Sequence, residues 1–213
     1  MLQLDHVILG VGDVDRAGEE LRQRYGLGSV AGGRHEAWGT GNRIVPLGSA
    51  YLEVMAVVDP AVARGTEFGR NLSAAVAGGD RFVGWSLRTD DLAAVAERLG
   101  LPMEEGGRVR PDGQTVRWRL AGRNAATPDA WLPFFIAWDI PPDAHPGRTE
   151  TEHPAGPSGI SWVEVAGDEA RLKEWLGGAD LPVRILDDEP WGVRAVGIAT
   201  TDGEVVVRAD ATA

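Results

Sequence analysis

The sequence predicts an α+β fold in which tandem β-α-β-β-β modules form curved mixed sheets around a cup-shaped pocket. Two observations predict it. The order of one strand, one helix and three strands recurs at intervals of roughly 75–80 residues, and residues on one face of the strand-like segments alternate with those on the other. The helix of each module would cover one sheet face. Two modules placed edge to edge would then curl their other faces around a concave space.

The first module spans residues 1–59. Residues 2–11 are rich in β-forming side chains and predict its first strand. Asp13 is a suitable N-cap and Gly26 a suitable stop for the helix between them. The apolar face of that helix is Val14, Ala17, Leu21 and Tyr25. Three more strands are predicted over residues 29–37, 42–47 and 51–58, with glycine-containing turns between them.

A helical connection over residues 60–81 leads to the second module, residues 82–139. The second module repeats the order of the first. Its predicted elements are a strand over residues 81–88, a helix over residues 92–99, strands over residues 108–110, 115–121 and 131–139, and a long turn over residues 122–129.

A proline-rich connection over residues 140–158 predicts either a linker or an ordered loop over the mouth of the cup. The third module, residues 159–208, has a helix capped by Asp168 and the same order of strands. Three modules are an odd number for a fold that works in pairs. The first module therefore pairs with either the second or the third, and a leftover sheet face could pair across a homodimer.

Composition narrows the class of partner. The net charge of −11 disfavours nucleic acid, and there are no cysteines to form disulfides or ligate zinc. The sequence contains no run of about 18 apolar residues, so it predicts no membrane-spanning helix. The first residues predict a strand, because they lack the basic segment and cleavage site of a signal peptide. We expect a cytoplasmic protein that binds a small molecule and neither nucleic acid nor a membrane.

Two polar residues interrupt apolar strands. Glu53 lies in the strand over residues 51–58, and its face also carries Tyr51 and Met55. A buried carboxylate needs a partner. His6 lies between Leu4 and Ile8 on one face of the first strand. If the first and last strands of the module are neighbours, His6 and Glu53 approach each other on the concave side.

This arrangement resembles the vicinal oxygen chelate superfamily, which includes glyoxalase I, extradiol dioxygenases, fosfomycin-modifying enzymes and bleomycin-sequestering proteins. More narrowly, residues 32–43 (GGRHEAWGTGNR), followed by Tyr51-Leu52-Glu53, are similar to the glyoxalase-like domain proteins of bacteria. Residues 132–138 (LPFFIAW) and Glu152-His153-Pro154 are also similar to that subgroup. The resemblance covers most of the chain.

The resemblance implies that His6 and Glu53 are ligands of a divalent metal (Zn, Mn, Ni or Fe), with two more ligands from the paired module. The aligned positions do not supply them. Gly84 or Ser161 falls opposite His6, and an aromatic or aliphatic residue of the strand over residues 132–139 falls opposite Glu53. Three interpretations of the pair stay open: metal ligands, contacts to a small molecule without a metal, and a buried hydrogen-bonded pair.

Further candidates lie near the glycine-rich turn and in the proline-rich connection. Arg34 would clamp an anionic substrate, and His35, like Glu53, would act in acid–base catalysis. The substrate-binding candidates are Arg34, Trp38, Thr40, Asn42, Tyr51 and His153. All of them except Tyr51 have a structural alternative: a solvated strand edge for Arg34, turn formation for Thr40 and Asn42, core packing for tryptophan, and a solvated loop for His153.

The leading hypothesis is a glyoxalase-like protein that binds a small organic molecule in its cup, with metal-dependent lyase, isomerase or dioxygenase chemistry as the enzymatic form. The alternative is a metal-free binding or sequestering protein, similar to those that confer drug resistance.

Overall fold

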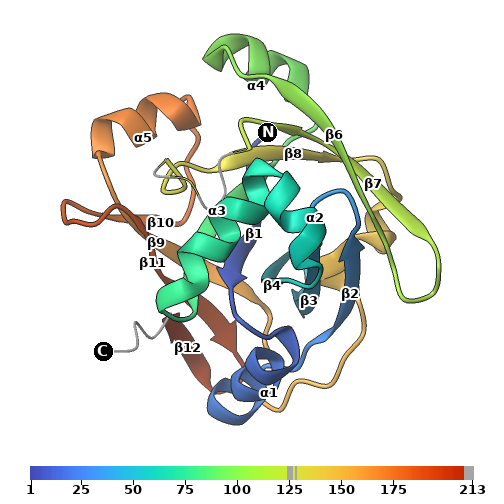
Figure 1. Ribbon diagram of the computed structural model, residues 1–213. Coiled ribbons are helices and arrows are strands. Elements are labelled where there is room, and N and C mark those ends of the chain that lie inside the picture. Colours follow the sequence, from blue (N-terminus) through green and yellow to red (C-terminus); the bar gives the residue numbers. More distant parts are fainter. Residues whose placement is uncertain (124–126, 128, 209–213) are drawn as a thin grey trace.

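The computed structural model describes residues 1–123, 127 and 129–208 of the 213-residue chain. Eight strands form a closed barrel, and four later strands form a separate sheet beside it (Figure 1). The barrel strands are β1 (Gln3–Gly10), β2 (Val30–His35), β3 (Thr40–Leu47), β4 (Ala50–Val57), β5 (Arg81–Arg88), β6 (Met103–Val109), β7 (Thr115–Ala121) and β8 (Phe134–Trp138). The second sheet contains β9 (Gly159–Ala166), β10 (Val183–Leu186), β11 (Gly192–Thr200) and β12 (Gly203–Arg208).

The strand order of the barrel shows which modules pair. Its strand order is β1-β4-β3-β2-β6-β7-β8-β5, so the first four strands of the chain join the next four edge to edge. Parallel β1 and β4 are neighbours, and β1 also pairs antiparallel with β5. On the other side β2 meets β6 through the pair Arg34 and Val109. The predicted α+β class with curved mixed sheets around a cup is confirmed.

In the part of the chain that the structure describes, five α-helices cover the sheets, and their ends follow the capping residues of the sequence. They are α1 (Val14–Tyr25), α2 (Pro60–Gly65), α3 (Glu67–Ala75), α4 (Leu92–Leu99) and α5 (Glu169–Leu176). The Asp13 side chain accepts hydrogen bonds from two backbone N–H groups of α1, and Gly26 ends that helix at φ 66°. The connection over residues 60–81 holds two helices, because Thr66 ends α2 and caps α3.

Apolar side chains form two cores, one on each side of the barrel wall. Leu52, Val54 and Ala56 belong to the core outside the barrel, which α1, α4, α5 and the second sheet cover. Ile8 and Met55 belong to the core inside it. The alternation along β4 therefore separates the two faces as the sequence predicts. Across the outer core, β11 contacts β5 and β9 contacts β4, so the second sheet packs against the barrel.

A bulge changes the expected alternation in β1. The pairing of β1 with β5 shifts register between Leu4 and His6. Leu4 packs against the outer core, whereas His6 lines the inner cavity, so the two do not share a face as strict alternation predicts. The extra residue of the bulge is Asp5, whose side chain is fully buried. The bulge therefore brings Asp5 beside His6.

The proline-rich connection forms an ordered loop. It contains two short 3₁₀ helices, η2 (Pro142–Ala144) and η3 (Pro146–Arg148). The Gly147 carbonyl accepts a hydrogen bond from the Gly48 N–H at 2.8 Å, next to the turn between β3 and β4. This anchors His145, which reaches Asp5 at the barrel wall. The predicted turn over residues 122–129 lies partly outside the described residues.

Within the part of the chain that the structure describes, no helix has the length and apolar character needed to cross a bilayer.

Candidate functional site

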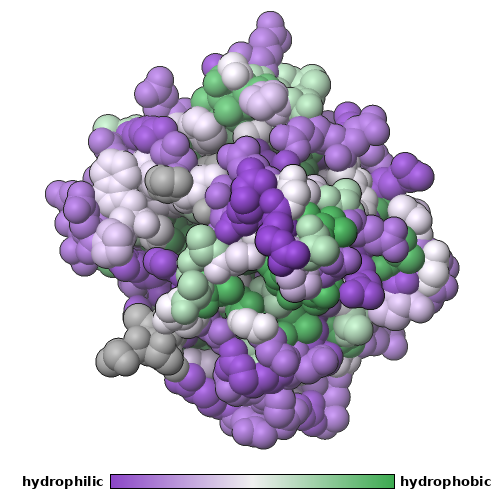
Figure 2. Space-filling model, viewed as in Figure 1, coloured by the Kyte–Doolittle hydropathy of each residue, from purple (hydrophilic) through white to green (hydrophobic). Residues whose placement is uncertain are grey.

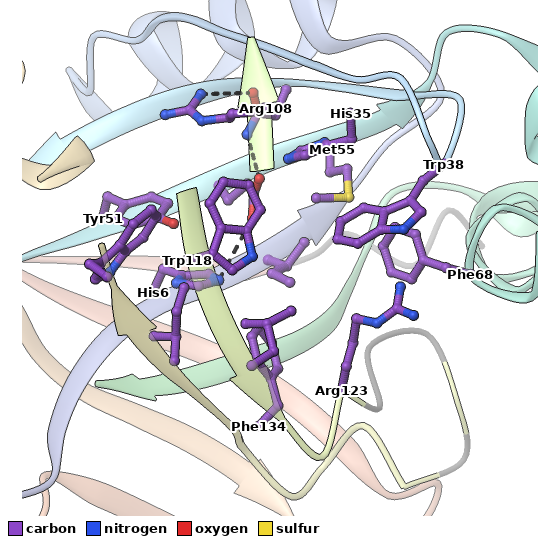
Figure 3. Close-up of a pocket in the computed structure, with 16 residues that line it drawn as sticks. His6, His35, Trp38, Tyr51, Met55, Phe68, Arg108, Trp118, Arg123 and Phe134 are labelled. Carbon is purple, nitrogen blue, oxygen red and sulfur yellow. Dashed lines mark hydrogen bonds and ion pairs between the residues drawn. The ribbon is translucent and has the colours of Figure 1, made fainter. Parts of the chain in front are cut away.

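A pocket lies inside the barrel (Figure 3). Most of its wall is aromatic or aliphatic, and its polar groups come mainly from β1 to β4 and β6. The aromatic lining residues are Trp38, Tyr51, Phe68, Trp118, Phe134 and Trp138. The ionisable or amide lining residues are His6, His35, Asn42, Glu53, Arg108 and Arg123. On the face shown in Figure 2, hydrophobic side chains gather around α2, α3 and the adjacent barrel, within a rim of hydrophilic ones.

His6 and Glu53 meet in this pocket, as the neighbouring positions of β1 and β4 allow. His6 Nε2 lies 3.7 Å from Glu53 Oε2, which is too long for a hydrogen bond. Glu53 is instead held by Asn42, whose amide N–H donates to Glu53 Oε1. Asn42 Oδ1 accepts from Arg108 Nη1 at 3.2 Å. A buried chain of hydrogen bonds thus runs from Arg108 to Glu53 and leaves His6 Nε2 unused.

Asp5 fixes the orientation of His6. Its Oδ1 lies 2.7 Å from His6 Nδ1, and its Oδ2 accepts from Trp138 Nε1 at 3.0 Å and contacts His145 Nε2 at 3.0 Å. Burial alone would raise the pKa of the Asp5 carboxyl, but hydrogen bonds from His145 and His6 outweigh burial and hold that pKa well below its usual range. Ionised Asp5 only accepts, so His6 Nδ1 donates. In the neutral ring, His6 Nε2 therefore carries the lone pair and faces the pocket.

His145 is locked in a complementary form. The Gly147 N–H donates to its Nδ1 at 3.1 Å, which makes Nε2 the donor to Asp5. Asp5 thus receives hydrogen bonds from two imidazoles, one on each of its oxygens. This arrangement holds the carboxylate in place with little freedom to turn.

His35 also lines the pocket and is buried. Its Nδ1 is 3.1 Å from the Thr40 hydroxyl, and its ring stacks on Trp38 with 5.2 Å between the centroids. Burial lowers the pKa of His35 to about 4; the charges of Arg108 and His6 act in the same direction, and Glu53 opposes them. His35 is therefore neutral at pH 7.

Tyr51 forms the floor beneath His6. The two rings stack with 4.7 Å between centroids and 16° between planes. Burial raises the pKa of the Tyr51 phenol well above its usual value, and Glu53 and Asp5 add to the effect. The phenol stays protonated, so Tyr51 restricts the tilt of His6 without adding charge to the pocket.

An arginine closes the aromatic side of the pocket. The Arg123 guanidinium carbon lies 4.7 Å from the ring centroid of Trp38 and 5.6 Å from that of Phe68 (Figure 3). Its Nη2 pairs with Glu104 Oε2 at 2.8 Å. Among the described residues, Nε and Nη1 have no hydrogen-bond acceptor.

Several predicted site residues line the pocket together: His6, His35, Trp38, Asn42, Tyr51 and Glu53. Three others do not. Thr40 is buried behind His35 and supports it, and Arg34 is exposed on β2. His153 accepts a hydrogen bond from the Gly28 N–H at 3.0 Å, outside the barrel lining. The roles assigned to these residues stay predictions.

Several residues of the site were not predicted from the sequence, among them Asp5, Phe68, Arg108, Trp118 and Arg123. Strict alternation assigns Asp5 to the face opposite His6, and the bulge breaks that alternation. Arg108 lies on β6, where it pairs with Val116, and Trp118 lies on β7, where buried and exposed residues alternate. That alternation, buried at positions 116, 118 and 120 and exposed between them, was a usable signal in the sequence.

The described residues do not fit a catalytic metal centre. Within residues 1–123, 127 and 129–208, no three His, Asp or Glu side chains converge as ligands. Ser86 pairs with His6 and Gly84 with Ile8, and β8 contributes Phe134 and Ile136 to the lining. Only His6 and Glu53 of the expected ligand set are present. Superfamily members often use divalent metals, but this donor set is half of what such sites normally contain.

Comparison with known proteins agrees with this geometry. The family model described as a glyoxalase-like domain matches residues 4–179. The chain belongs to the glyoxalase-like domain family. The resemblance seen in the sequence is confirmed. No curated protein matches the chain.

Solved structures that are similar to this chain have low sequence identity to it. A hypothetical protein from Staphylococcus aureus has a TM-score of 0.71 at 19% identity, over 92% of this chain and 90% of that one. A methylmalonyl-CoA epimerase from Mycobacterium tuberculosis has a TM-score of 0.44 at 22% identity, over 63% and 85% of the two chains. A variant of the Streptomyces coelicolor methylmalonyl-CoA epimerase, in complex with 2-nitronate-propionyl-CoA, has a TM-score of 0.46 at 18% identity, over 65% and 98%.

Proposed function

We propose that this glyoxalase-like protein binds a small, largely aromatic or apolar molecule inside the barrel and that His6 transfers a proton to or from it. The observation that carries the proposal is the orientation of His6. Its Nδ1 donates to Asp5 at 2.7 Å, and its Nε2 faces the pocket 3.7 Å from Glu53 with no hydrogen bond between them. A neutral imidazole held in this way is a general base.

The residues around His6 support proton transfer without a metal-dependent step. When Nε2 takes a proton, the ring becomes an imidazolium whose charge lies next to ionised Asp5. Glu53, on the other side of Nε2, adds to that stabilisation and can accept the proton in turn. The proton would come from a carbon or oxygen of the substrate, as in an isomerase or lyase.

The second candidate is binding without turnover, which the mostly apolar wall favours. Five indole or phenyl rings line the pocket: Trp38, Phe68, Trp118, Phe134 and Trp138. Such a wall would hold a flat apolar molecule through stacking and area burial. In this form His6 and Asp5 would only shape one end of the cavity.

Ligand binding and solvent exchange distinguish the two candidates. We would screen small carbonyl compounds by quenching of tryptophan fluorescence, since Trp38 and Trp118 line the pocket. Each bound compound would then be incubated with the protein in D₂O and examined by NMR. Proton transfer predicts that deuterium enters the compound, and that His6→Gln abolishes entry while His153→Gln does not.

Binding without deuterium entry for any bound compound would overturn the catalytic proposal in favour of the binding one. If none of the screened compounds quenches the tryptophan fluorescence, both the catalytic and the binding proposal are overturned.

A further inference from the structure

We infer that the ligand of the barrel pocket carries a carboxylate, and that Arg108 is the residue that recognises it. The inference rests on the proposed function of this pocket and names the chemical class of its ligand. Three features of the pocket carry it: the position of Arg108, the space that the fold leaves for its guanidinium, and the charges that face it.

Arg108 is a buried cation with few partners. The residue is 7% exposed, yet its side chain makes one hydrogen bond among the described residues, to Asn42 Oδ1 at 3.2 Å. In that same part of the chain, no carboxylate lies within ion-pair distance of its guanidinium. A guanidinium has five N–H donors, and a buried charge is unfavourable unless it is paired. Most of the donors of Arg108 are therefore available to a ligand.

The fold makes room for this guanidinium. Arg108 lies on β6, next to β2, where Gly32 faces the pair formed by Arg108 and Asn42. A Cβ at Gly32 would lie 2.5 Å from Arg108 Nη1 and 2.2 Å from Asn42 Oδ1. Any side chain at that position would push the guanidinium away. The absence of a side chain at Gly32 thus lets Arg108 and Asn42 meet at the wall of the pocket.

The Arg108 guanidinium has no carboxylate partner among the described residues. A second guanidinium lines the pocket, that of Arg123, but it already pairs with Glu104 at 2.8 Å. Asn42 stands between Arg108 and Glu53, so the carboxylate does not occupy the donors of Arg108. Burial lowers the pKa of Arg108, which indicates how poorly its charge is solvated. A ligand carboxylate would offset that charge through charge-assisted hydrogen bonds.

The aromatic residues of the pocket wall indicate what the rest of the ligand is. Trp118 and Phe134 lie on the sheet walls, and Trp38 and Phe68 lie on the side covered by α3 (Figure 3). Because these side chains are aromatic, they suit an aromatic ring that bears the carboxylate.

The test compares matched pairs of compounds that differ only in charge. We would measure binding of 2-naphthoate and 2-naphthamide, and of benzoate and benzamide, by isothermal titration calorimetry. We expect each carboxylate to bind about tenfold or more tightly than its amide. Arg108→Gln should remove the preference, and Arg108→Lys should keep part of it. The control Arg119→Gln, on an exposed residue paired with Asp139, should leave it unchanged.

Each outcome of these titrations supports or overturns a stated part of the inference. Equal binding of carboxylates and amides would overturn the inference while leaving the proposed binding function intact. A preference that survives Arg108→Gln but is lost in Arg123→Gln would overturn the assignment to Arg108. Binding of none of the four compounds would overturn the inference and count against the aromatic class in the proposed function. If Arg108→Gln does not fold, the comparison within the wild-type protein still decides the ligand class.

Discussion

Acidification should destabilise the fold through His35. In the folded protein burial lowers the pKa of His35 to about 4, against 6.5 for an exposed histidine. Between these two values the unfolded chain binds a proton that the folded protein does not, so stability falls as the pH falls through this window. From pH 7.5 to pH 5 the two pKa values give a loss of about 2 kcal/mol from this one residue. Below about pH 4 both states are protonated and the contribution becomes constant.

Urea unfolding followed by tryptophan fluorescence measures this directly. The free energy of unfolding would be determined at pH 7.5 and pH 5 for the wild-type protein and for His35→Gln. The variant should lose about 2 kcal/mol less than the wild type between the two pH values. His153→Gln is the matched control, because burial lowers the pKa of this half-buried histidine as well, but it lies outside the barrel. His153→Gln should reduce the loss of unfolding free energy between pH 7.5 and pH 5 by less than His35→Gln does.

Equal losses of stability on acidification in His35→Gln and the wild-type protein would refute this role of His35. That result would mean that His35 is solvated or is already protonated in the folded protein. The absolute stability of the variant at pH 7.5 does not enter the test, because only the change with pH is compared.

Three further predictions concern Asp5, Gly32 and metal. Asp5→Asn places an amide where two imidazoles and an indole donate, so it should lower stability by about 3 kcal/mol in urea unfolding; a change under about 1 kcal/mol would show that the cluster is not formed. Gly32→Ala should cost about 1–3 kcal/mol by overpacking, whereas Gly12→Ala, with no atom within 4 Å of its added Cβ, should be tolerated. Zinc, manganese, nickel or iron should bind weakly, since His6 and Glu53 are two donors only among the described residues; one tightly bound equivalent, lost in His6→Ala, would contradict this.

Much of the first half of the site could be predicted from the sequence because its signals are local. Alternation along β4 places Glu53 and Tyr51 on one face, and the order of elements makes β1 and β4 neighbours. The meeting of His6 with Glu53 follows from these two facts. Helix ends were equally predictable, since Asp13 and Gly26 act through hydrogen bonds within a few residues.

The rest of the site depends on contacts that no local pattern encodes. A bulge moves Asp5 to the side of His6, and a bulge inserts one residue without a sequence signature of its own. His145 reaches Asp5 across 140 positions of the chain. Arg108 approaches Asn42 only because β6 and β2 become neighbours when the two halves of the barrel join. These residues are placed by tertiary pairing, so strand alternation alone could not assign them.

The state of the His6 ring tests the central claim most directly. A long-range ¹H–¹⁵N NMR spectrum of the imidazole groups at pH 7.5 distinguishes the two neutral forms of each histidine. The hydrogen bond to Asp5 predicts that His6 carries its proton on Nδ1 and leaves Nε2 free, and that Asp5→Asn perturbs this form. A spectrum in which His6 carries its proton on Nε2, or is unchanged in Asp5→Asn, would contradict the account of His6 as a base oriented by Asp5.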